Sequence, residues 1–314
     1  MPDIPGTQKY QGESGRTRAS DRAARRFAPL PAEFTFTVDV EEHGATGRAA
    51  AATRRLLDLL ERAGARGTFF VLDDVVRQDA GLVREVARRG HEVASHGQGH
   101  LHLADQGPAA FRAGTLAARD RLADLLGMAP QGYRAPYFSL TPRAAWAPAI
   151  LAEAGFAYSS SLLPAWSPLA GWPGAPRQPF LWPGGVLELP VPVGRVGPLR
   201  LPFLGGMYLR WLPPWRLSTL VRSWAAENRG GHLWSYCHPY DLDAGEGLVR
   251  RADAGLAGSV MLWLNRGPTM PRLEGLLRGR RSEPFAARLP ALRAAAAAWQ
   301  PQDAPGALRA APAA

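Results

Sequence analysis

The stretch EFTFTVDV, residues 33–40, predicts a β-strand, because apolar and aromatic residues alternate with threonine. A helix is expected next, from a cap at Thr46 to about Ala63. GTFFVL, residues 67–72, then predicts a second strand. A strand, a helix and a strand in this order are typical of a βα unit, in which the two strands run parallel.

The same alternation of strands and helices recurs further along the chain. Strands are expected at 91–95, 132–136, 156–160, 186–190 and 232–237, and helices at 80–89, 108–127, 141–154 and 214–228. In a chain of 314 residues this alternation favours a closed or distorted (β/α) barrel over an open doubly wound sheet. No glycine-rich loop of the kind that binds dinucleotides or phosphates follows the first strand. This absence argues against an open sheet that binds such a cofactor.

The composition is that of a globular protein, with 46% hydrophobic and 20% charged residues. The net charge of +10 comes almost wholly from arginines, and no basic stripe is interleaved with aromatic residues. We therefore expect no nucleic-acid partner. Cys237 is the one cysteine, so the chain can form no internal disulfide and no all-cysteine metal site. We expect Cys237 to be a small core residue rather than a ligand or nucleophile.

Three regions are expected: a disordered basic arm at 1–31, one catalytic domain at 32–285, and a helix with a loose tail at 286–314. The N-terminus has no apolar run of signal-peptide length, which predicts a cytoplasmic protein. The most hydrophobic region, 199–221, is broken by arginines and prolines and cannot span a membrane. It could still touch a membrane surface or a partner.

A long loop at 162–185 interrupts the alternation and is rich in proline, glycine and tryptophan. Loops of this length inside a domain are usually functional or disordered. Trp166, Trp172 and Trp182 suit stacking on sugar rings, which would make them substrate contacts. At least as good an interpretation is that these indoles pin the loop to the body of the domain.

Acidic and histidine side chains mark the ends of two predicted strands. Asp39 and Glu41 are two residues apart and project from the same face of the first strand. Two carboxylates this close repel each other when both are ionised, and a bound cation would relieve that repulsion. The alternative interpretation is that both carboxylates lie in solvent at the end of the strand. His96 and His100 follow the 91–95 strand in a glycine-rich turn. Two imidazoles and one carboxylate with an open fourth position form a catalytic Zn²⁺ arrangement.

Further candidate site residues lie at or near the ends of the predicted strands. Arg134, in GYRAPYFS, could hold a carboxylate ionised, and the backbone N–H of Tyr137 could point inward as an oxyanion donor. His238, in YCHPYD, ends a late strand at the same expected rim. His43 follows the acidic pair and could line the site as a substrate contact. Of the other histidines near the site, we interpret His91 as structural and His102 as peripheral.

Together, TVDVE, SHGQGH, GYRAPYF, AGFAYSSSL and CHPYD resemble, in this order, the polysaccharide deacetylase (NodB-homology, carbohydrate esterase 4) family. LGGMYLRWLP and HPYD resemble the subfamily found with exopolysaccharide and exosortase loci. The resemblance covers roughly residues 33–280. It implies a distorted (β/α) barrel and a divalent metal, most simply Zn²⁺, that serves the removal of N-acetyl groups from amino sugars.

The resemblance also implies roles for single residues. By position, the implied roles are Asp39 as base, Glu41, His96 and His100 as metal ligands, Arg134 as holder of the base, Tyr137 as oxyanion donor and His238 as acid. The first motif departs from the family's commoner adjacent D-D, since it reads D-x-E. The family's Asp/Trp motif that tunes the acid has no clear match, and Trp146 is a loose candidate.

Other functions remain open at this point. The same scaffold could hydrolyse another linear or cyclic amide, as in the allantoinase branch. The protein could also bind a polysaccharide without catalysis, through its tryptophan-rich loop. Binding of nucleic acid or an anionic membrane through the N-terminal arm is a third alternative. The sequence does not name the glycan, and a lipid-linked precursor is one candidate.

Overall fold

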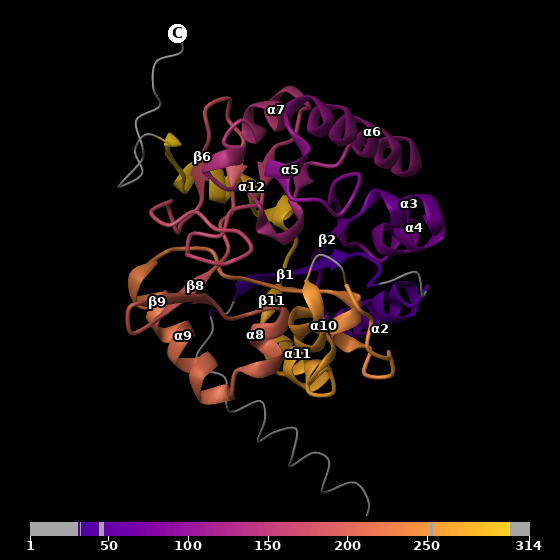
Figure 1. Cartoon of the computed structure of the whole chain (residues 1–314), viewed down its shortest axis with the longest axis vertical. Helices are drawn as coiled ribbons and strands as arrows, with labels where there is room; N and C mark the ends of the chain where they lie inside the picture. Colours follow the sequence, from indigo (N-terminus) through magenta and orange to yellow (C-terminus); the bar gives the residue numbers. More distant parts are fainter. Residues whose placement is uncertain (1–30, 32, 44–46, 252–253, 302–314) are drawn as a thin grey trace, which may run out of the picture.

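The central element is a mostly parallel sheet surrounded by helices (Figure 1). The computed structural model describes residues 31, 33–43, 47–251 and 254–301. The arm expected at 1–31 lies, apart from residue 31, outside the described residues, as do Thr46 and the tail from 302 onward. Within the described residues the strands follow the order β10-β1-β2-β3-β4-β5-β7-β6-β12, and β11 also pairs with β1.

The strands expected from the sequence are all present, although several are shorter, and the strands at 180–181, 193–196, 199–202, 281–282 and 297–298 are additional. They are β1 (Glu33–Val40), β2 (Gly67–Val71), β3 (Glu92–Ser95), β4 (Gly132–Tyr133), β5 (Tyr158–Ser159), β6 (Phe180–Leu181), β7 (Leu187–Glu188), β10 (Trp234–Cys237), β11 (Arg281–Ser282) and β12 (Ala297–Ala298). A separate hairpin joins β8 (Val193–Val196) to β9 (Leu199–Pro202). Every residue of β1 after Glu33 is buried, because both faces of this central strand are covered.

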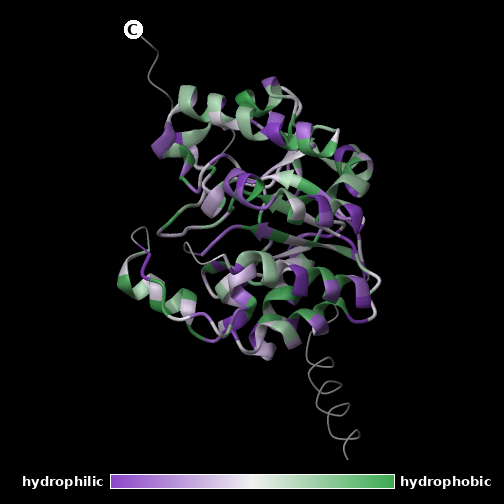
Figure 2. Ribbon diagram, turned by 90° about the vertical axis from the view of Figure 1, so that its right-hand side faces the viewer, coloured by the Kyte–Doolittle hydropathy of each residue, from purple (hydrophilic) through white to green (hydrophobic). Residues whose placement is uncertain are grey.

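The helices connect and cover these strands. They are α2 (Ala49–Arg62), α3 (Asp73–Gln78), α4 (Ala80–Arg88), α5 (Leu103–Gln106), α6 (Pro108–Leu126), α7 (Ala147–Glu153), α8 (Gly206–Trp211), α9 (Pro214–Glu227), α10 (Gly255–Trp263), α11 (Thr269–Leu277) and α12 (Phe285–Ala295). Short 3₁₀ turns are η1 (Pro136–Phe138), η2 (Pro142–Ala144) and η3 (Pro239–Leu242). The helix expected at 141–154 is divided into η2 and α7. In Figure 2 the surrounding helices carry both hydrophobic and hydrophilic residues, as amphipathic helices do.

The barrel is distorted because the strand path does not close on itself. Its ends are β10 and β12, and the free edge of β10 meets only residues 204–205, through a bridge between Gly205 and Tyr236. The indole Nε1 of Trp234 donates to the carbonyl of Pro190 at 3.1 Å, which links β10 to the chain just after β7. A distorted (β/α) barrel is the architecture that the sequence predicted.

Strand register places the chemistry at one edge of the sheet. β1 pairs in parallel with both β10 and β2, and Val38 of β1 lies opposite Cys237 of β10. β3 pairs in parallel with β2 and β4. Because the carboxyl ends of parallel strands meet at one edge, the residues that follow β1, β3, β4 and β10 are neighbours.

Candidate active site

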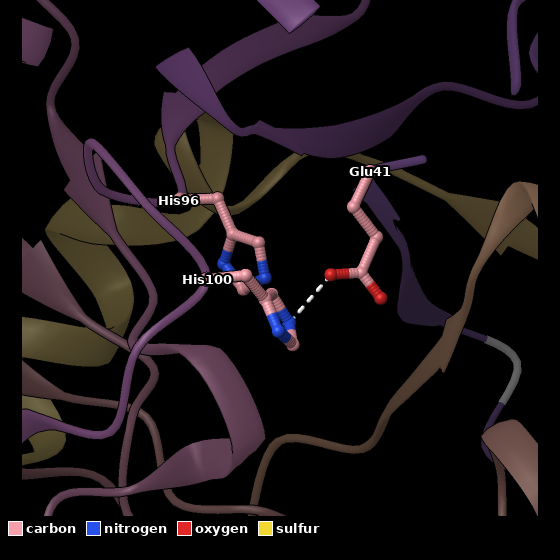
Figure 3. A group of neighbouring side chains, drawn as sticks. All are labelled: Glu41, His96 and His100. Carbon is pink, nitrogen blue, oxygen red and sulfur yellow. Dashed lines mark ion pairs between the residues drawn. The ribbon is translucent and has the colours of Figure 1, made fainter. Parts of the chain in front are cut away.

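Two histidines and a glutamate form a compact group of ligand atoms at this edge (Figure 3). One ligand atom each from Glu41, His96 and His100 lies within 4.8 Å of the others. Oε2 of Glu41 is 2.5 Å from Nε2 of His100. Nδ1 of His96 hydrogen-bonds to the backbone oxygen of Arg134 at 2.9 Å, which leaves Nε2 of His96 to face the group. No other group of this kind occurs in the residues that the structure describes.

The protonation states of this group suit metal binding. Burial acts to raise the pKa of Glu41, but His100 and the neighbouring histidines outweigh it and lower the pKa to about 2. Burial lowers the pKa of His96 to about 4. Near neutral pH the carboxylate is therefore ionised and the His96 imidazole is neutral, which are the forms that bind a cation. Two imidazole nitrogens and one carboxylate fit a divalent metal that keeps a further position open.

Asp39 lies beside this group and is held by a buried arginine. Nη1 of Arg134 donates to Oδ1 of Asp39 at 2.6 Å. The same guanidinium bonds to the backbone oxygen and Oγ of Ser160, and it lies 3.9 Å from the ring centroid of Phe70 and 4.6 Å from that of Trp234. Arg134 is fully buried, so its charge has Asp39 as its ionised partner inside the barrel. The pair holds the Asp39 side chain in one orientation.

His238 faces Asp39 from the neighbouring strand. Nε2 of His238 is 3.9 Å from Oδ2 of Asp39 and 4.0 Å from Oε1 of Glu41. On its other side, Nδ1 of His238 hydrogen-bonds to Oδ2 of Asp241 at 3.0 Å. Burial acts to lower the pKa of His238, but the hydrogen bond and charge of Asp241 outweigh it, so the pKa lies above its ordinary value. His238 is therefore suited to carry a proton near neutral pH.

Tyr137 adopts a strained backbone next to the histidines. Its φ of 59° and ψ of 11° lie in the left-handed region, which costs a residue with a β-carbon roughly 1–2 kcal/mol. The Tyr137 ring lies edge-on to His100 at 4.4 Å between centroids and stacks on His102 at 4.3 Å. Such outliers cluster at functional sites, where the surrounding structure holds them in place.

With this geometry established, comparison with known proteins is informative. Residues 35–158 match the family described as Polysaccharide deacetylase. This part of the chain is similar to that family, and it contains Asp39, Glu41, His96, His100 and Arg134. Residues 160–288 match a second family, described as a Domain of unknown function (DUF3473).

Relatives of the deacetylase region are bacterial enzymes. Peptidoglycan-N-acetylglucosamine deacetylase PgdA of Listeria monocytogenes is 32% identical over 99 residues, which are 32% of this chain and 21% of PgdA. A peptidoglycan-N-acetylglucosamine deacetylase of Bacillus cereus is 29% identical over 85 residues, which are 27% of this chain and 31% of that enzyme. The chain thus spans about a fifth to a third of the length of these relatives.

Solved structures show that the deacetylase fold extends over most of the chain. A candidate polysaccharide deacetylase from Mycobacterium smegmatis aligns with a TM-score of 0.55 and 21% identity, over 83% of this chain and 90% of that one. The Puue allantoinase aligns with a TM-score of 0.53 and 15% identity, over 84% of this chain and 90% of that one. At these identities the likeness establishes the distorted (β/α) barrel and nothing finer.

Two buried residues of the site escaped the sequence analysis. Asp241 bonds His238, and Nε of Arg210 lies 3.1 Å from Oδ1 of Asp241 in an ion pair that lacks hydrogen-bond geometry. The signal was present in HPYD, because a polar residue three positions after a strand-ending histidine can cap the turn that follows. Trp146, the candidate for the tuning motif, instead precedes α7 and packs on Phe111, away from His238.

The predicted substrate contacts divide into exposed and buried groups. Trp166 is 74% exposed and keeps its ring available to a ligand. Trp172 and Trp182 are buried and pack against each other and Trp299, so neither has a free ring face for a sugar. They pin the loop to the domain, which corrects the prediction that they stack on substrate.

His43 also lies inside the protein rather than on the substrate side. Its Nδ1 is 2.9 Å from Oε2 of Glu246, which in turn pairs with the buried Arg266 at 2.6 Å. Its ring lies 4.5 Å from that of Tyr240, which stacks on His238. The predicted substrate contact at His43 is therefore corrected: His43 is buried behind Tyr240, where it lines a small cavity together with Glu41.

Proposed function

We propose that this protein is a metal-dependent hydrolase that removes N-acetyl groups from amino sugars of a polysaccharide or of its precursor. The observation that carries the proposal is the arrangement of Asp39 and His238. These two proton-transfer groups face each other across 3.9 Å, each held from behind by a buried partner, beside the Glu41, His96 and His100 ligand group. A structural ion pair would not need this ligand group at its side.

The residues divide the reaction among them. A divalent cation held by Glu41, His96 and His100, which we propose to be Zn²⁺, would supply Lewis-acid polarisation of a water and of the acetamide carbonyl. Asp39 accepts a proton from the attacking water, and the hydrogen bond from Arg134 orients Asp39 for this step. His238 donates a proton to the nitrogen of the amino sugar as the C–N bond breaks, and acetate and a free amine leave.

Tyr137 serves the tetrahedral intermediate in this proposal. The oxyanion forms when water adds to the acetamide carbonyl, and a backbone N–H aimed at that oxygen stabilises it. The left-handed backbone at Tyr137 turns the peptide relative to the preceding strand end, and its ring lies against His100. Both observations support the Tyr137 N–H as the oxyanion donor.

The substrate is proposed from the relatives and from the exposed tryptophan. PgdA and the Bacillus cereus enzyme are named for N-acetylglucosamine in peptidoglycan. We infer that this chain acts on an N-acetylated glycan of an exopolysaccharide locus, as the LGGMYLRWLP and HPYD segments suggest. A lipid-linked precursor in the cytoplasm, met at a membrane surface, fits the same proposal. Trp166 would stack on a sugar ring of this glycan.

Metal content and acetate release test the proposal together. The purified protein should contain a divalent metal, and it should release acetate from at least one member of a panel of N-acetylated oligosaccharides. Asp39→Asn and His96→Ala should each lower acetate release by about a thousandfold or more, because each removes a group from the reaction centre. His96→Ala should also lower the metal content, whereas Asp39→Asn should not.

Other outcomes assign other functions. Ring opening of allantoin without acetate release would favour a cyclic-amide hydrolase on the same fold. A protein that binds glycan but holds no metal would be a binding module. Folded variants that release acetate as fast as wild type would refute the proposed mechanism.

A further inference from the structure

Helix α10 exposes its apolar side chains instead of burying them. Its sequence is GLAGSVMLW, yet Ser259 is its one buried residue. Leu256, Met261 and Trp263 are exposed, and so is Leu264 directly after the helix. A helix that packs on a domain normally buries its apolar stripe and exposes its polar side. α10 instead leaves these apolar side chains exposed, although the indole N–H of Trp263 donates to the backbone oxygen of Glu246 at 3.0 Å.

These side chains lie on one side of the helix. Positions 256, 260, 263 and 264 follow the spacing i, i+4, i+7 and i+8, which places them along a single stripe. Together with Met261 they are called here the α10 face. The opposite side is held to the protein, because Nη1 of Arg210 bonds the backbone oxygens of Leu262 at 2.8 Å and Leu264 at 3.1 Å.

An exposed tryptophan extends the α10 face. Trp211 follows Arg210 at the end of α8, and α8 lies beside α10 in Figure 1. The contacts of Arg210 with Leu264 and Asn265 place the end of α8, and with it Trp211, close to the end of α10. Tryptophan is enriched where proteins meet the headgroup region of a membrane, because its ring is apolar and its N–H is polar.

In the stretch of chain that contains α8 and α10, the exposed charges have one sign. Between residues 206 and 272 the described exposed charges are all arginines: Arg216, Arg222, Arg229 and Arg250. No aspartate or glutamate described in this range is exposed, and the half-buried Glu227 and Asp243 pair with Arg200 and Arg48. An apolar face with a cationic surround is complementary to a surface that is apolar below and anionic above, as a membrane of anionic phospholipids is.

The dimensions indicate a helix that lies on a membrane rather than crosses it. The nine residues of α10 span about 14 Å, whereas a bilayer's hydrocarbon core is about 30 Å thick. None of the described helices combines the length and apolar character that a membrane span needs. An apolar helix face of this size inserts only to the level of the headgroups and upper acyl chains.

We propose that the α10 face and Trp211 bind the surface of a membrane that contains anionic phospholipids. This binding is independent of the proposed deacetylation. It nevertheless has a consequence for the site, because Arg251 connects the two. The Arg251 N–H donates to Oγ of Ser259 in α10 at 2.9 Å, and its Nη2 donates to the hydroxyl of Tyr137 at 3.3 Å. Membrane binding would hold the Tyr137 side of the site close to the headgroups, where a lipid-linked glycan would be presented.

The test is sedimentation of the full chain with vesicles. Vesicles of phosphatidylcholine alone are compared with vesicles of phosphatidylcholine and phosphatidylglycerol, at low and at high salt. The variant is the double substitution Leu256→Glu with Met261→Glu, at side chains that are 59% and 43% exposed. The matched control is Met128→Glu with Leu169→Glu, which makes the same charge change at side chains that are 67% and 62% exposed elsewhere.

Wild type and control should sediment with the anionic vesicles, less so at high salt, and the double variant should bind about tenfold more weakly or worse. Absence of wild-type binding to anionic vesicles would overturn the proposal. Equal binding by the variant and the control would overturn it as well, since binding would then come from another part of the chain. A dimer in solution that the double variant abolishes would assign the α10 face to a second copy of the chain instead. Circular dichroism shows whether the variants fold, and the vesicle result does not depend on acetate release.

Discussion

The two halves of the domain build the site in different ways. Residues 35–158 run through β1 to β5 in regular βα alternation and supply Asp39, Glu41, His96, His100 and Arg134. Residues 160–288 hold loops, a hairpin and several helices, and they contribute two long-range parallel partners to β1, the strands β10 and β11. They also supply His238, which follows β10, Asp241 in η3 and Arg210 in α8.

This difference separates the two proton-transfer roles. The first half carries the proposed metal ligands and the proposed base, and it matches the family described as Polysaccharide deacetylase. The second half carries the proposed acid, although its matching family is described only as a domain of unknown function. In the proposed mechanism, one task of the second half is therefore to complete the site of the first. The following predictions test this division.

Removal of the acid should separate activity from metal binding. His238→Asn should lower kcat for acetate release by about a thousandfold, because general-acid catalysis at the leaving amine is lost. The metal content should stay at the wild-type level, since Glu41, His96 and His100 come from the other half. Acetate release and metal analysis of the same preparation provide the check. Loss of the metal from His238→Asn would mean that the two halves do not divide the work as described.

Removal of the Asp241 carboxylate, which bonds His238, should lower the rate of acetate release less than removal of His238 itself. It should also change the pH dependence of that rate. Asp241→Asn should lower kcat/KM by about ten- to a hundredfold, as loss of an orienting partner typically does. Asp241 raises the pKa of His238, so wild-type His238 stays protonated to a higher pH. Without that carboxylate the pKa falls, and the alkaline limb of the pH–rate profile should move to lower pH.

The control for this prediction is Asp243→Asn, the same change two residues further along. Asp243 pairs with Arg48, whereas the carboxylate that His238 bonds is that of Asp241. Its substitution should leave the alkaline limb in place. If Asp241→Asn lowers the rate but leaves the limb unmoved, Asp241 has a structural role and does not tune the acid.

The smallest effect is expected on the exposed ring of the second half. Trp166→Ala should raise KM by about two- to tenfold through lost stacking, and it should leave the melting temperature unchanged. Trp172→Ala should instead lower the melting temperature, because its ring fills the cluster with Trp182 and Trp299. Thermal melts and Michaelis curves of both variants distinguish the two roles. Equal KM values for Trp166→Ala and wild type would remove Trp166 from the substrate contacts.

The first half could be predicted well because its signals are local and repeated. The hydrophobic patterns predicted both ends of β1 correctly, and they predicted the ends of β2 and β3 to within one residue. Parallel pairing then brings their carboxyl ends together whatever the intervening helices do, so Glu41, His96 and Arg134 had to converge once the strands were known. The group of ligand atoms in the structure agrees with that inference.

The second half resisted prediction for physical reasons. A tryptophan in a proline-rich loop has no periodicity to show which way it faces, so Trp166 and Trp182 look alike in sequence although one is exposed and one is buried. The link between Asp241 and Arg210 joins residues thirty-one positions apart through tertiary packing alone. Only the local part of that link, the spacing of His238 and Asp241, is visible in the chain.

The parallel pairing of β10 with β1 has a consequence for how such enzymes can diversify. Asp39 and His238 each follow the paired residues Val38 and Cys237, so the backbone ladder itself sets the separation of base and acid. A slip of one residue in either strand would turn that strand's side chain to the opposite face and away from the other, and the register is therefore under strong constraint. Loops such as 162–185 carry no such constraint. Insertions and exchanges there could alter which glycan is accepted while the spacing of the two proton carriers stays as it is.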